Sequence, residues 1–479
     1  MLISTVHAQV RKPTIPDAPL PNRAPLEARL TSRPASLADS MTNAATDAST
    51  PAGGVSLYTI ADLALRNSKS VRVAEAVQQH ARAVIADTRD VYIPNLAVGS
   101  GLGPPSYGFP LGNPTLFNVT SNSLAFSFSQ RDYIRSARAV YKAATLSLKN
   151  ARQQVILDAA SDYIDLNKTL QQIAALNQAV DDTGKLVSVM QDRLHAGLET
   201  NIQMTRTRLT GAQIKLRAIQ MEDHAEDLRQ HLAGLTGLNA TDIVPAASSI
   251  PALPDLDFGP LIRQQRGENP GVLATAATAD ARMYNAWGDK RQNYRPTVGF
   301  GFQYARFATF TGYAKYYTPG SFQYNNVEAG IQATWPLFDR TRRAKADESQ
   351  AEAIQAREQA ELDRIQSEEG NLTLWRSLRE LEAQQQVANL QQQLAKDTLA
   401  ATVTQMNQGA VGNGTPVTPQ QADQDRIDER TSYVDLEDAQ FNVARVKLNL
   451  LNAVGELENW VQQSSPIVVG AASIKTGRR

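Results

Sequence analysis

Four short segments of the chain alternate large hydrophobic residues with small or polar ones. A period of two places alternate side chains on opposite faces of a β-strand, so each segment predicts a strand with one apolar face. The strands are expected at residues 92–103, 119–130, 295–306 and 326–336. The apolar positions are Leu96, Val98, Leu124, Phe126, Phe128, Val298, Phe300, Phe302, Tyr304, Ile331 and Trp335. The opposite face, rich in glycine and serine, includes Ser127, Ser129, Gln303, Glu328, Gln332 and Thr334.

Two proline-free stretches, 132–194 and 339–408, instead repeat hydrophobic residues in steps of three and four. This spacing predicts very long helices with a coiled-coil seam. At 1.5 Å per residue, each helix would span roughly 90–100 Å, which no globular domain requires. Helices expected at 202–234 and 418–460 return along them, so each long helix is one arm of a hairpin.

The order helix, strand, loop, strand, long helix, glycine loop, helix occurs twice, about 210 residues apart. Tyr92–Asn95 and Tyr294–Thr297 mark the start of the first strand in each half, and Gly197 corresponds to Gly409. One duplication therefore explains the chain. The opening helices are expected at 56–90 and 257–293.

Prolines and the repeat set the expected boundaries. Val6-His7-Ala8 is similar to the small-residue end of a secretory signal, although an ordinary N-terminus is the alternative. The predicted segments are a shortened signal remnant at 1–8, an extended or disordered proline-rich segment at 9–54, repeat 1 at 55–244, a linker at 245–256, repeat 2 at 257–460 and a tail at 461–479.

Composition excludes several classes of function. Lys+Arg and Asp+Glu both number 48, so the net charge is zero and no basic surface calls for nucleic acid. The chain has no cysteine, which excludes disulfides, thiolate metal sites and cysteine nucleophiles. No stretch approaches the roughly 20 apolar residues of a membrane-spanning helix, so a membrane crossing would require a closed β-barrel.

The strands admit two interpretations. In a soluble sandwich the apolar faces would meet a second sheet, but the rest of the chain supplies none. A transmembrane barrel has apolar residues outside, polar residues inside and aromatics at the interfaces. Four strands cannot close a barrel, so it would have to be shared between chains. Two copies would give eight strands and three would give twelve, and the residues alone do not choose.

No chemical site stands out. His224 and His231 share a helix at i, i+7, a spacing that does not suit a two-histidine metal site and fits a solvated surface. Arg342, Arg343 and Lys345 fit either an interfacial collar or a solvated helix face. No nucleophile, base and acid form a set, so we expect no catalytic residues, no metal and no cofactor.

Taken together, these segments resemble the TolC-like outer membrane efflux protein family over roughly residues 55–460. The resemblance is carried by Leu57–Ala64, Glu268–Val272, Trp335–Arg340 and Arg193–Thr200, which occur in the family's order. It implies a mainly α fold with a small β part, in which a trimeric twelve-stranded transmembrane β-barrel continues into a twelve-helix periplasmic α-barrel.

The resemblance also implies partners and a location. The chain would be a passive homotrimeric conduit of an efflux or type I secretion system. It would contact outer-membrane lipid, a periplasmic adaptor protein and an inner-membrane pump or transporter, with its helices in the periplasm of a Gram-negative-type bacterium. The adaptor would open the channel by gripping the hairpin tips. The residues expected there are Arg193, Gly197, Leu198, Thr200, Gly409, Asn413, Gly414 and Thr415.

Some features depart from the family, and other functions compete. The stretch after the second tip, 417–423, is mostly neutral, so a cation-binding gate is not expected there. The absent cysteine argues against the lipoprotein branch. A periplasmic coiled-coil adaptor or scaffold is the main alternative, but an adaptor should have one hairpin and this chain has two. A hydrolase on a helical scaffold lacks a catalytic constellation.

Overall fold

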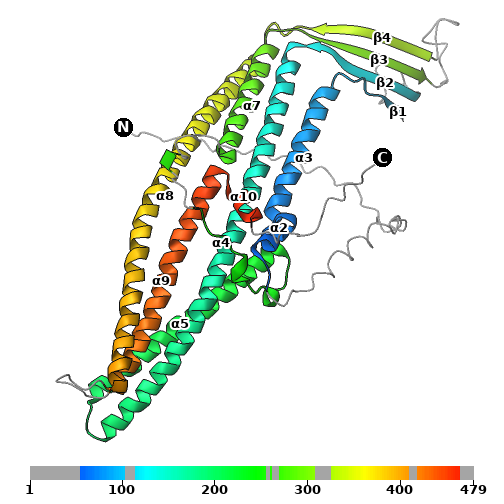
Figure 1. The fold of residues 1–479 in the computed structure, drawn as a ribbon. Coiled ribbons are helices and arrows are strands. Elements are labelled where there is room, and N and C mark those ends of the chain that lie inside the picture. Colours follow the sequence, from blue (N-terminus) through cyan, green and yellow to red (C-terminus); the bar gives the residue numbers. More distant parts are fainter. Residues whose placement is uncertain are drawn as a thin grey trace, which may run out of the picture. The chain divides into compact units, whose positions relative to one another are not determined.

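Helices make up most of the chain in the computed structural model, and one four-stranded antiparallel sheet lies at one end of them (Figure 1). The structure describes residues 54–102, 114–254, 259–260, 269–307, 325–408 and 418–463. The expectation of a mainly helical chain with a small sheet is confirmed. The elements are α2 (Leu57–Asn67), α3 (Lys69–Asp90), β1 (Ala97–Leu102), β2 (Pro114–Ser127), α4 (Phe128–His195), α5 (Asn201–Thr236), η1 (Ala240–Asp242), η2 (Ala247–Ser249), α7 (Pro270–Gln292), β3 (Thr297–Phe307), β4 (Asn325–Thr334), α8 (Arg340–Gln408), α9 (Pro419–Val454) and α10 (Leu457–Gln462).

The sheet has the strand order β1-β2-β3-β4, with every neighbouring pair antiparallel. Strands β3 and β4 pair in an unbroken register from Thr297 opposite Thr334 to Arg306 opposite Asn325. The register of β2 against β3 shifts twice, and one shift lies between Leu124 and Phe126. Because no further strand flanks β1 or β4 in the described chain, both outer edges of the sheet are open.

The helices form a layer in which α4 and α8 run the full length. Near the sheet, α4 packs against α3 and α7, and α7 packs against α8. Toward the hairpin ends, α4 packs against α5 and α9, and α9 packs against α8. Each half of the layer is thus four helices wide, with α3 and α5 along one side and α8 along the other (Figure 1).

Capping residues explain where the helices begin. Ser127 accepts a hydrogen bond from the backbone N–H of Gln130 and so starts α4. Thr200 and Thr418 do the same for α5 and α9, and Asn269 caps α7. Side-chain oxygens at these positions satisfy N–H groups that have no partner within the helix.

Glycines in the left-handed conformation end two helices. Gly237 has φ +78° at the end of α5, and Gly455 has φ +80° at the end of α9. A residue without a side chain adopts this conformation at little cost, so both helices stop where the sequence places glycine.

Several boundaries differ from the sequence-based expectation. The first opening helix is two helices, because the chain is extended at Ser68 (ψ 129°) between α2 and α3. The second strand was expected to reach residue 130, but it ends at Ser127, where α4 starts. The last helix was expected to continue to Trp460, but Gly455 separates α9 from α10. Residues 1–53, the strand loops 103–113 and 308–324, and the second hairpin tip at 409–417 lie outside the described residues.

The largest core surrounds the middle of α4. Tyr163 is fully buried there, and its hydroxyl donates to the carbonyl oxygen of Val55 at 2.7 Å. The same hydroxyl accepts from the backbone N–H of Ala246 at 2.8 Å and lies 2.8 Å from the Ser249 hydroxyl. One side chain therefore joins α4 to the start of the described chain and to the segment after α5.

Candidate functional site

The sheet has two chemically different faces. The register places Gln303 opposite Glu328, and it places Gly299 and Thr297 opposite Gln332 and Thr334. The four predicted pore-lining residues Gln303, Glu328, Gln332 and Thr334 therefore share one face of β3 and β4. The opposite face carries Val298, Phe300, Phe302, Tyr304, Val327 and Ile331.

The apolar face is open to solvent in the single chain. Ile331 has an exposed fraction of 76%, and Leu96 and Val98 have 73% and 70%. Contiguous apolar surface of this kind marks an interaction site in soluble proteins or contact with membrane. Trp335, 63% exposed, lies one residue beyond β4, and Leu96 lies one residue before β1.

The other face is hollowed. A cavity of about 780 Å³ lies over β2, β3 and β4, and its floor includes Gly299, Gly301 and Gly330. Glycine has no side chain beyond hydrogen, so this face of the sheet is recessed where the three glycines lie. The polar side chains around them are Thr120, Asn122, Thr297, Gln303, Glu328, Gln332 and Thr334.

The bulge in β2 shows that the face predicted for Leu124 is wrong. Leu124 pairs with Gly299, while Phe126 pairs with Val298. Gly299 and Val298 point to opposite faces, so Leu124 lies on the hollowed face and Phe126 on the apolar one. An extra residue in one strand shifts its alternation relative to the partner, and that shift separates these two side chains.

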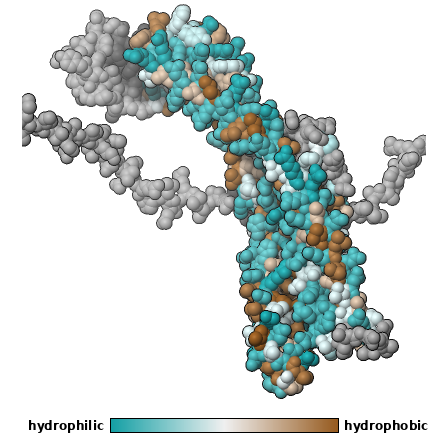
Figure 2. All heavy atoms as spheres, turned by 90° about the vertical axis from the view of Figure 1, so that its left-hand side faces the viewer, coloured by the Kyte–Doolittle hydropathy of each residue, from teal (hydrophilic) through white to brown (hydrophobic). Residues whose placement is uncertain are grey.

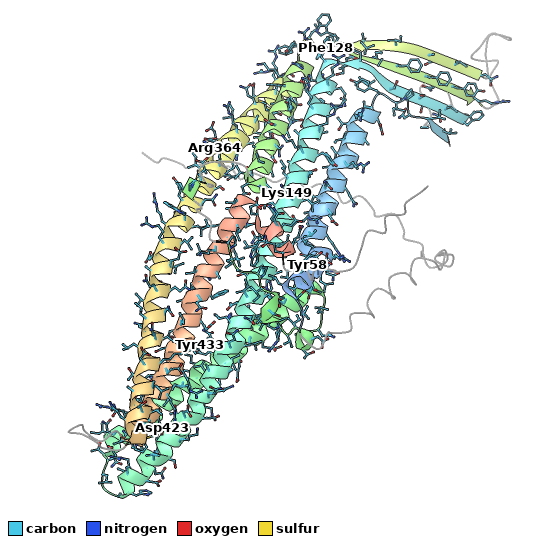
Figure 3. The ribbon with its side chains drawn as sticks, viewed as in Figure 1. Tyr58, Phe128, Lys149, Arg364, Asp423 and Tyr433 are labelled. Atoms are coloured by element: carbon cyan, nitrogen blue, oxygen red, sulfur yellow. The ribbon has the colours of Figure 1, made fainter. Side chains whose placement is uncertain are left out.

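Three residues assigned to the second strand lie at the start of α4. Phe128 and Ser129 are its first two residues, and Ser127 is its cap. The hydroxyls of Ser127 and Ser129 lie 2.9 Å apart, and both side chains are buried. For that reason we leave both serines out of the proposed pore lining. Phe128 lies at the boundary between sheet and helices (Figure 3).

A buried polar network, which the sequence did not single out, lies beneath the sheet. The Asp132 carboxylate is inaccessible to solvent and pairs with Arg135 and Arg291. Tyr133 donates to Asp289 of α7 at 2.6 Å, and burial, together with this hydrogen bond, raises the pKa of the Tyr133 hydroxyl. The first turns of α4 are thereby fixed to α7. The α4 and α7 members of this network are far apart in the sequence, so no local pattern signalled it.

The first hairpin tip is compact. Gly197 has φ +71°, and the backbone N–H groups of Gly197 and Leu198 donate to the carbonyls of Leu194 and Arg193 at 3.0 and 2.9 Å. The Arg193 guanidinium lies 3.3 Å from the Glu199 carboxylate. Leu198 is 68% exposed at the turn. The second-tip residues Gly409, Asn413, Gly414 and Thr415 lie outside the described residues.

Polar contacts join the two hairpins along α4 and α9. Arg430 of α9 lies 3.0 Å from the Asp182 carboxylate of α4. The Gln172 amide donates to the Val434 carbonyl at 2.9 Å and to the Asp438 carboxylate at 2.7 Å.

The two histidines weighed as metal ligands bridge α5 to α4. His224 lies 3.1 Å from the Asp165 carboxylate, and His231 lies 2.5 Å from Asp162. Burial raises the pKa of the Asp162 carboxyl, while the hydrogen bond with His231 opposes that effect. Both histidine side chains are exposed, as expected of a solvated surface, and they also form contacts between the helices. Among the described residues, no group of three His, Cys, Asp or Glu side chains could hold a metal ion.

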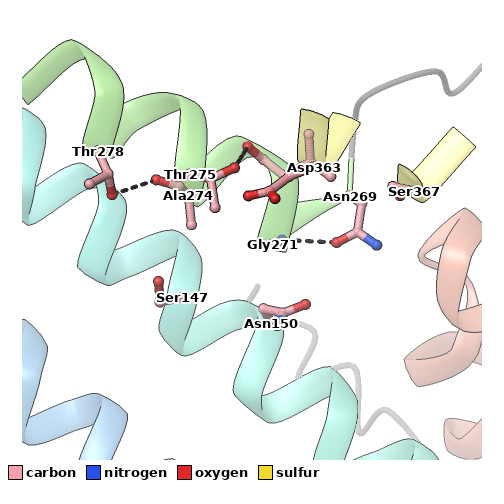
Figure 4. A pocket seen from close by; sticks show the side chains of 10 residues that line it. Ser147, Asn150, Asn269, Gly271, Ala274, Thr275, Thr278, Asp363 and Ser367 are labelled. Atoms are coloured by element: carbon pink, nitrogen blue, oxygen red, sulfur yellow. Dashed lines mark hydrogen bonds between the residues drawn. The ribbon is translucent and has the colours of Figure 1, made fainter. Parts of the chain in front are cut away.

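A second, polar hollow of about 480 Å³ lies where α4, α7 and α8 meet (Figure 4). Most of its lining residues carry hydroxyl, amide or carboxylate groups, and Gly271, Val272 and Ala274 at the start of α7 complete the lining. The polar residues are Ser147, Asn150, Asn269, Thr275, Thr278, Asp363 and Ser367.

None of the described helices combines the length and the apolarity that crossing a membrane requires.

The sequence and the fold both match outer-membrane proteins. Residues 60–238 match the family model described as outer membrane efflux protein. No protein of curated function matches the sequence. The outer-membrane channel OprN aligns with a TM-score of 0.65 at 16% identity, over 85% of this chain and 90% of that one.

Two further solved channels have the same fold. The CmeC outer membrane channel of Campylobacter jejuni aligns with a TM-score of 0.66 at 14% identity, over 85% of this chain and 89% of that one. VceC of Vibrio cholerae aligns with a TM-score of 0.65 at 18% identity, over 83% of this chain and 96% of that one. These proteins are channels, and at such identities the likeness shows the fold.

A pH-dependent change in stability is expected at Glu437 of α9. Burial, and to a lesser degree the neighbouring Asp438, raises the pKa of the Glu437 carboxyl, although Tyr433 and Lys168 oppose this. A raised pKa in the folded state means that ionised Glu437 lowers stability, a cost that is full above the folded pKa and absent below the unfolded one. At pH 7, Glu437→Gln should therefore raise the unfolding temperature by roughly a degree or two.

The difference should vanish as the pH falls below about 4, where the wild-type carboxyl is protonated as well. Thermal unfolding followed by circular dichroism across this pH range measures it, with the exposed Glu358→Gln as control. A Glu437→Gln gain that is independent of pH would contradict the assignment.

Proposed function

We propose that this chain, whose residues 60–238 match the outer membrane efflux protein model, is a member of that family and the outer-membrane channel of an efflux or secretion system. The observation that carries the proposal is the sheet, with one exposed apolar face, one hollowed polar face and two open edges. In lipid the apolar face would be covered, and water would fill the polar side.

We further propose that three copies share one barrel. An open strand edge cannot face lipid, because its N–H and C=O groups would have no partners. Joining β4 of one copy to β1 of the next pairs both edges, and three copies give twelve strands. In this arrangement Gln303, Glu328, Gln332 and Thr334 line the pore.

The sides of the helical layer support the same ring. Hydrophobic side chains are exposed along α8, and Figure 2 shows hydrophobic patches on the face that carries this helix. Others are exposed on α3 and α5, at the opposite side of the layer. Packing the α8 side of one copy against α3 and α5 of the next is a head-to-tail contact that closes into a ring. The exposed residues are Ile354, Leu362, Ile365, Val387, Leu390 and Leu394 on α8, and Val73, Val77, Ile202, Leu209, Leu216 and Ile219 on α3 and α5.

The channel is passive and is opened from outside, by a periplasmic adaptor that contacts the hairpin tips and links the trimer to an inner-membrane pump or transporter. The exposed Leu198 and the Arg193–Glu199 pair are the contacts offered by the first tip. An adaptor opens the channel only to the extent that it binds the open state more tightly than the closed one.

Membrane fractionation and conductance test this proposal together. The chain, expressed in a Gram-negative host, should sediment with the outer membrane and resist carbonate extraction. The purified protein should form ion-conducting pores in planar bilayers. Recovery in the soluble periplasmic fraction would instead favour a scaffold or adaptor protein.

A charge on the exposed stripe of α8 should prevent assembly. Leu390 and Leu394 are 58% and 67% exposed in the single chain, so Leu390→Glu with Leu394→Glu leaves its internal packing intact. Each subunit contact would lose about 2 kcal/mol per leucine that the trimer buries. Native gels should then show monomers, whereas the exposed Asn389→Glu, on another face of α8, should leave the trimer intact. A trimeric double variant would exclude this side as the subunit contact.

A charge at the first tip should impair export without affecting assembly. Leu198→Glu introduces a carboxylate at an exposed turn position, where no packing is lost. If the adaptor contacts this residue, export measured by drug susceptibility or secretion should fall at least roughly tenfold, since a contact residue commonly contributes more than 1 kcal/mol. Loss of the trimer on native gels would show that Leu198 acts in assembly.

A further inference from the structure

Three exposed arginines lie over aromatic rings at the junction of the sheet and the helices. The first follows β2, the second precedes β3, and the third lies in the first turn of α8. A guanidinium over a ring is held by the negative face of the π system. The pairs are Arg131 over Phe126 at 5.7 Å, Arg295 over Phe128 at 5.1 Å and over Tyr294 at 5.4 Å, and Arg343 over Phe338 at 5.7 Å.

These three arginines keep their hydrogen-bonding capacity. In the part of the chain that the structure describes, no carboxylate pairs with Arg131, Arg295 or Arg343, although Arg135 and Arg342 nearby are each paired with an aspartate. A stacked guanidinium has its N–H donors free around the ring edge, in the planar fork that binds phosphate bidentately.

Each adjacent helix start already has a side-chain cap. Ser127 caps α4, and the Asp339 carboxylate accepts from the backbone N–H of Arg342 at 3.1 Å. An anion at this level would therefore bind the arginines and not the helix ends. Residues 339–345 contain four cationic side chains and one carboxylate, so the local charge is positive.

An apolar surface borders the arginines on the sheet side. Trp335, Leu337 and Phe338 are 63%, 81% and 76% exposed, and they continue the apolar face of the sheet toward α8. Large apolar side chains on the sheet side and unpaired cations on the helix side match the boundary between acyl chains and phosphates in a phospholipid layer.

We propose that Arg131, Arg295 and Arg343 form a collar that binds the phosphates of phospholipids in the leaflet nearest the helices, with preference for anionic phospholipids. This proposal rests on the proposed function, because it requires the sheet to lie in a membrane. The aromatic rings orient each guanidinium, and the phosphate accepts its N–H hydrogen bonds. Anionic phospholipids are preferred because zwitterionic ones carry a cation that the positive collar repels.

Lipid titration of the purified full chain in detergent tests the collar. Short-chain phosphatidylglycerol should raise the unfolding temperature of the wild type at lower concentration than short-chain phosphatidylcholine does. In Arg131→Gln, Arg295→Gln, Arg343→Gln the apparent affinity for phosphatidylglycerol should fall at least roughly tenfold, from three lost cation contacts. The matched control, Arg82→Gln, Arg152→Gln, Arg379→Gln, removes the same charge from exposed helical positions away from the junction and should titrate like the wild type.

Two further variants keep the test decisive. Lysine at the three collar positions retains charge without the planar fork and should bind with intermediate affinity. If the triple glutamine variant does not assemble, Arg343→Gln alone should lose roughly fivefold, with Arg379→Gln as its control. A collar variant that titrates like the wild type, a control that weakens equally, or equal affinity for both lipids would overturn the proposal.

Inorganic phosphate separates lipid from free anion. Equal stabilisation by phosphate at the same concentration would mean an anion site that does not recognise lipid, and would also overturn the proposal. Failure of the proposed function would be seen differently, as wild-type protein that neither sediments with the outer membrane nor conducts. Conductance without a collar-dependent lipid preference would reject the collar alone.

Discussion

The open edges of the four-stranded sheet constrain everything else in this structure. Backbone N–H and C=O groups along β1 and β4 have no partner strand in the described chain, and β4 is exposed along its whole length. In water such edges invite pairing with another chain, and in lipid they are not tolerated at all. The apolar face of the same sheet excludes stable exposure to water. In the proposed trimer both requirements are met together, because neighbouring copies complete the sheet.

The helical layer, like the sheet, leaves apolar surface uncovered in a single chain. A bundle would bury the apolar stripes of its helices against each other, yet here α8 keeps Leu390 and Leu394 exposed while Leu209 and Leu216 of α5 are exposed at the other side. One layer four helices wide cannot satisfy both sides by itself. The proposed ring of identical copies would give the layer and the sheet neighbours along corresponding sides.

Most of the helices and strands could be predicted from the sequence, because they depend on the periodicity of hydrophobic residues. Alternation located the strands, and proline-free runs of three-and-four spacing located α4 and α8. Periodicity could not show features that depend on a single residue, such as a bulge or a helix cap. The bulge that places Leu124 on the hollowed face can be predicted only if the pairing with the partner strand is known. Ser127, which ends β2 and caps α4, also fits the alternating pattern of a strand. Long-range polar contacts, such as Tyr133 with Asp289, join residues far apart in sequence and leave no local pattern.

The seam between the two hairpins differs from the packing within the first. The core toward the tips is built mostly from α4 and α5, and α9 adds only Ile427 and Val434 among its buried members. The seam between α4 and α9 is instead bridged by Arg430 with Asp182 and by Gln172. Parting apolar side chains costs their full transfer free energy, whereas a polar contact exchanged for water changes stability by about 1 kcal/mol. Toward the tips, movement of α8 and α9 away from α4 therefore exposes fewer buried apolar side chains than opening the first hairpin. Around the middle of α4 the seam is apolar, because α9 adds Val443, Val446, Leu448, Leu450, Leu451 and Val454 to the largest core. The proposed adaptor would therefore act on the part of the seam near the tips.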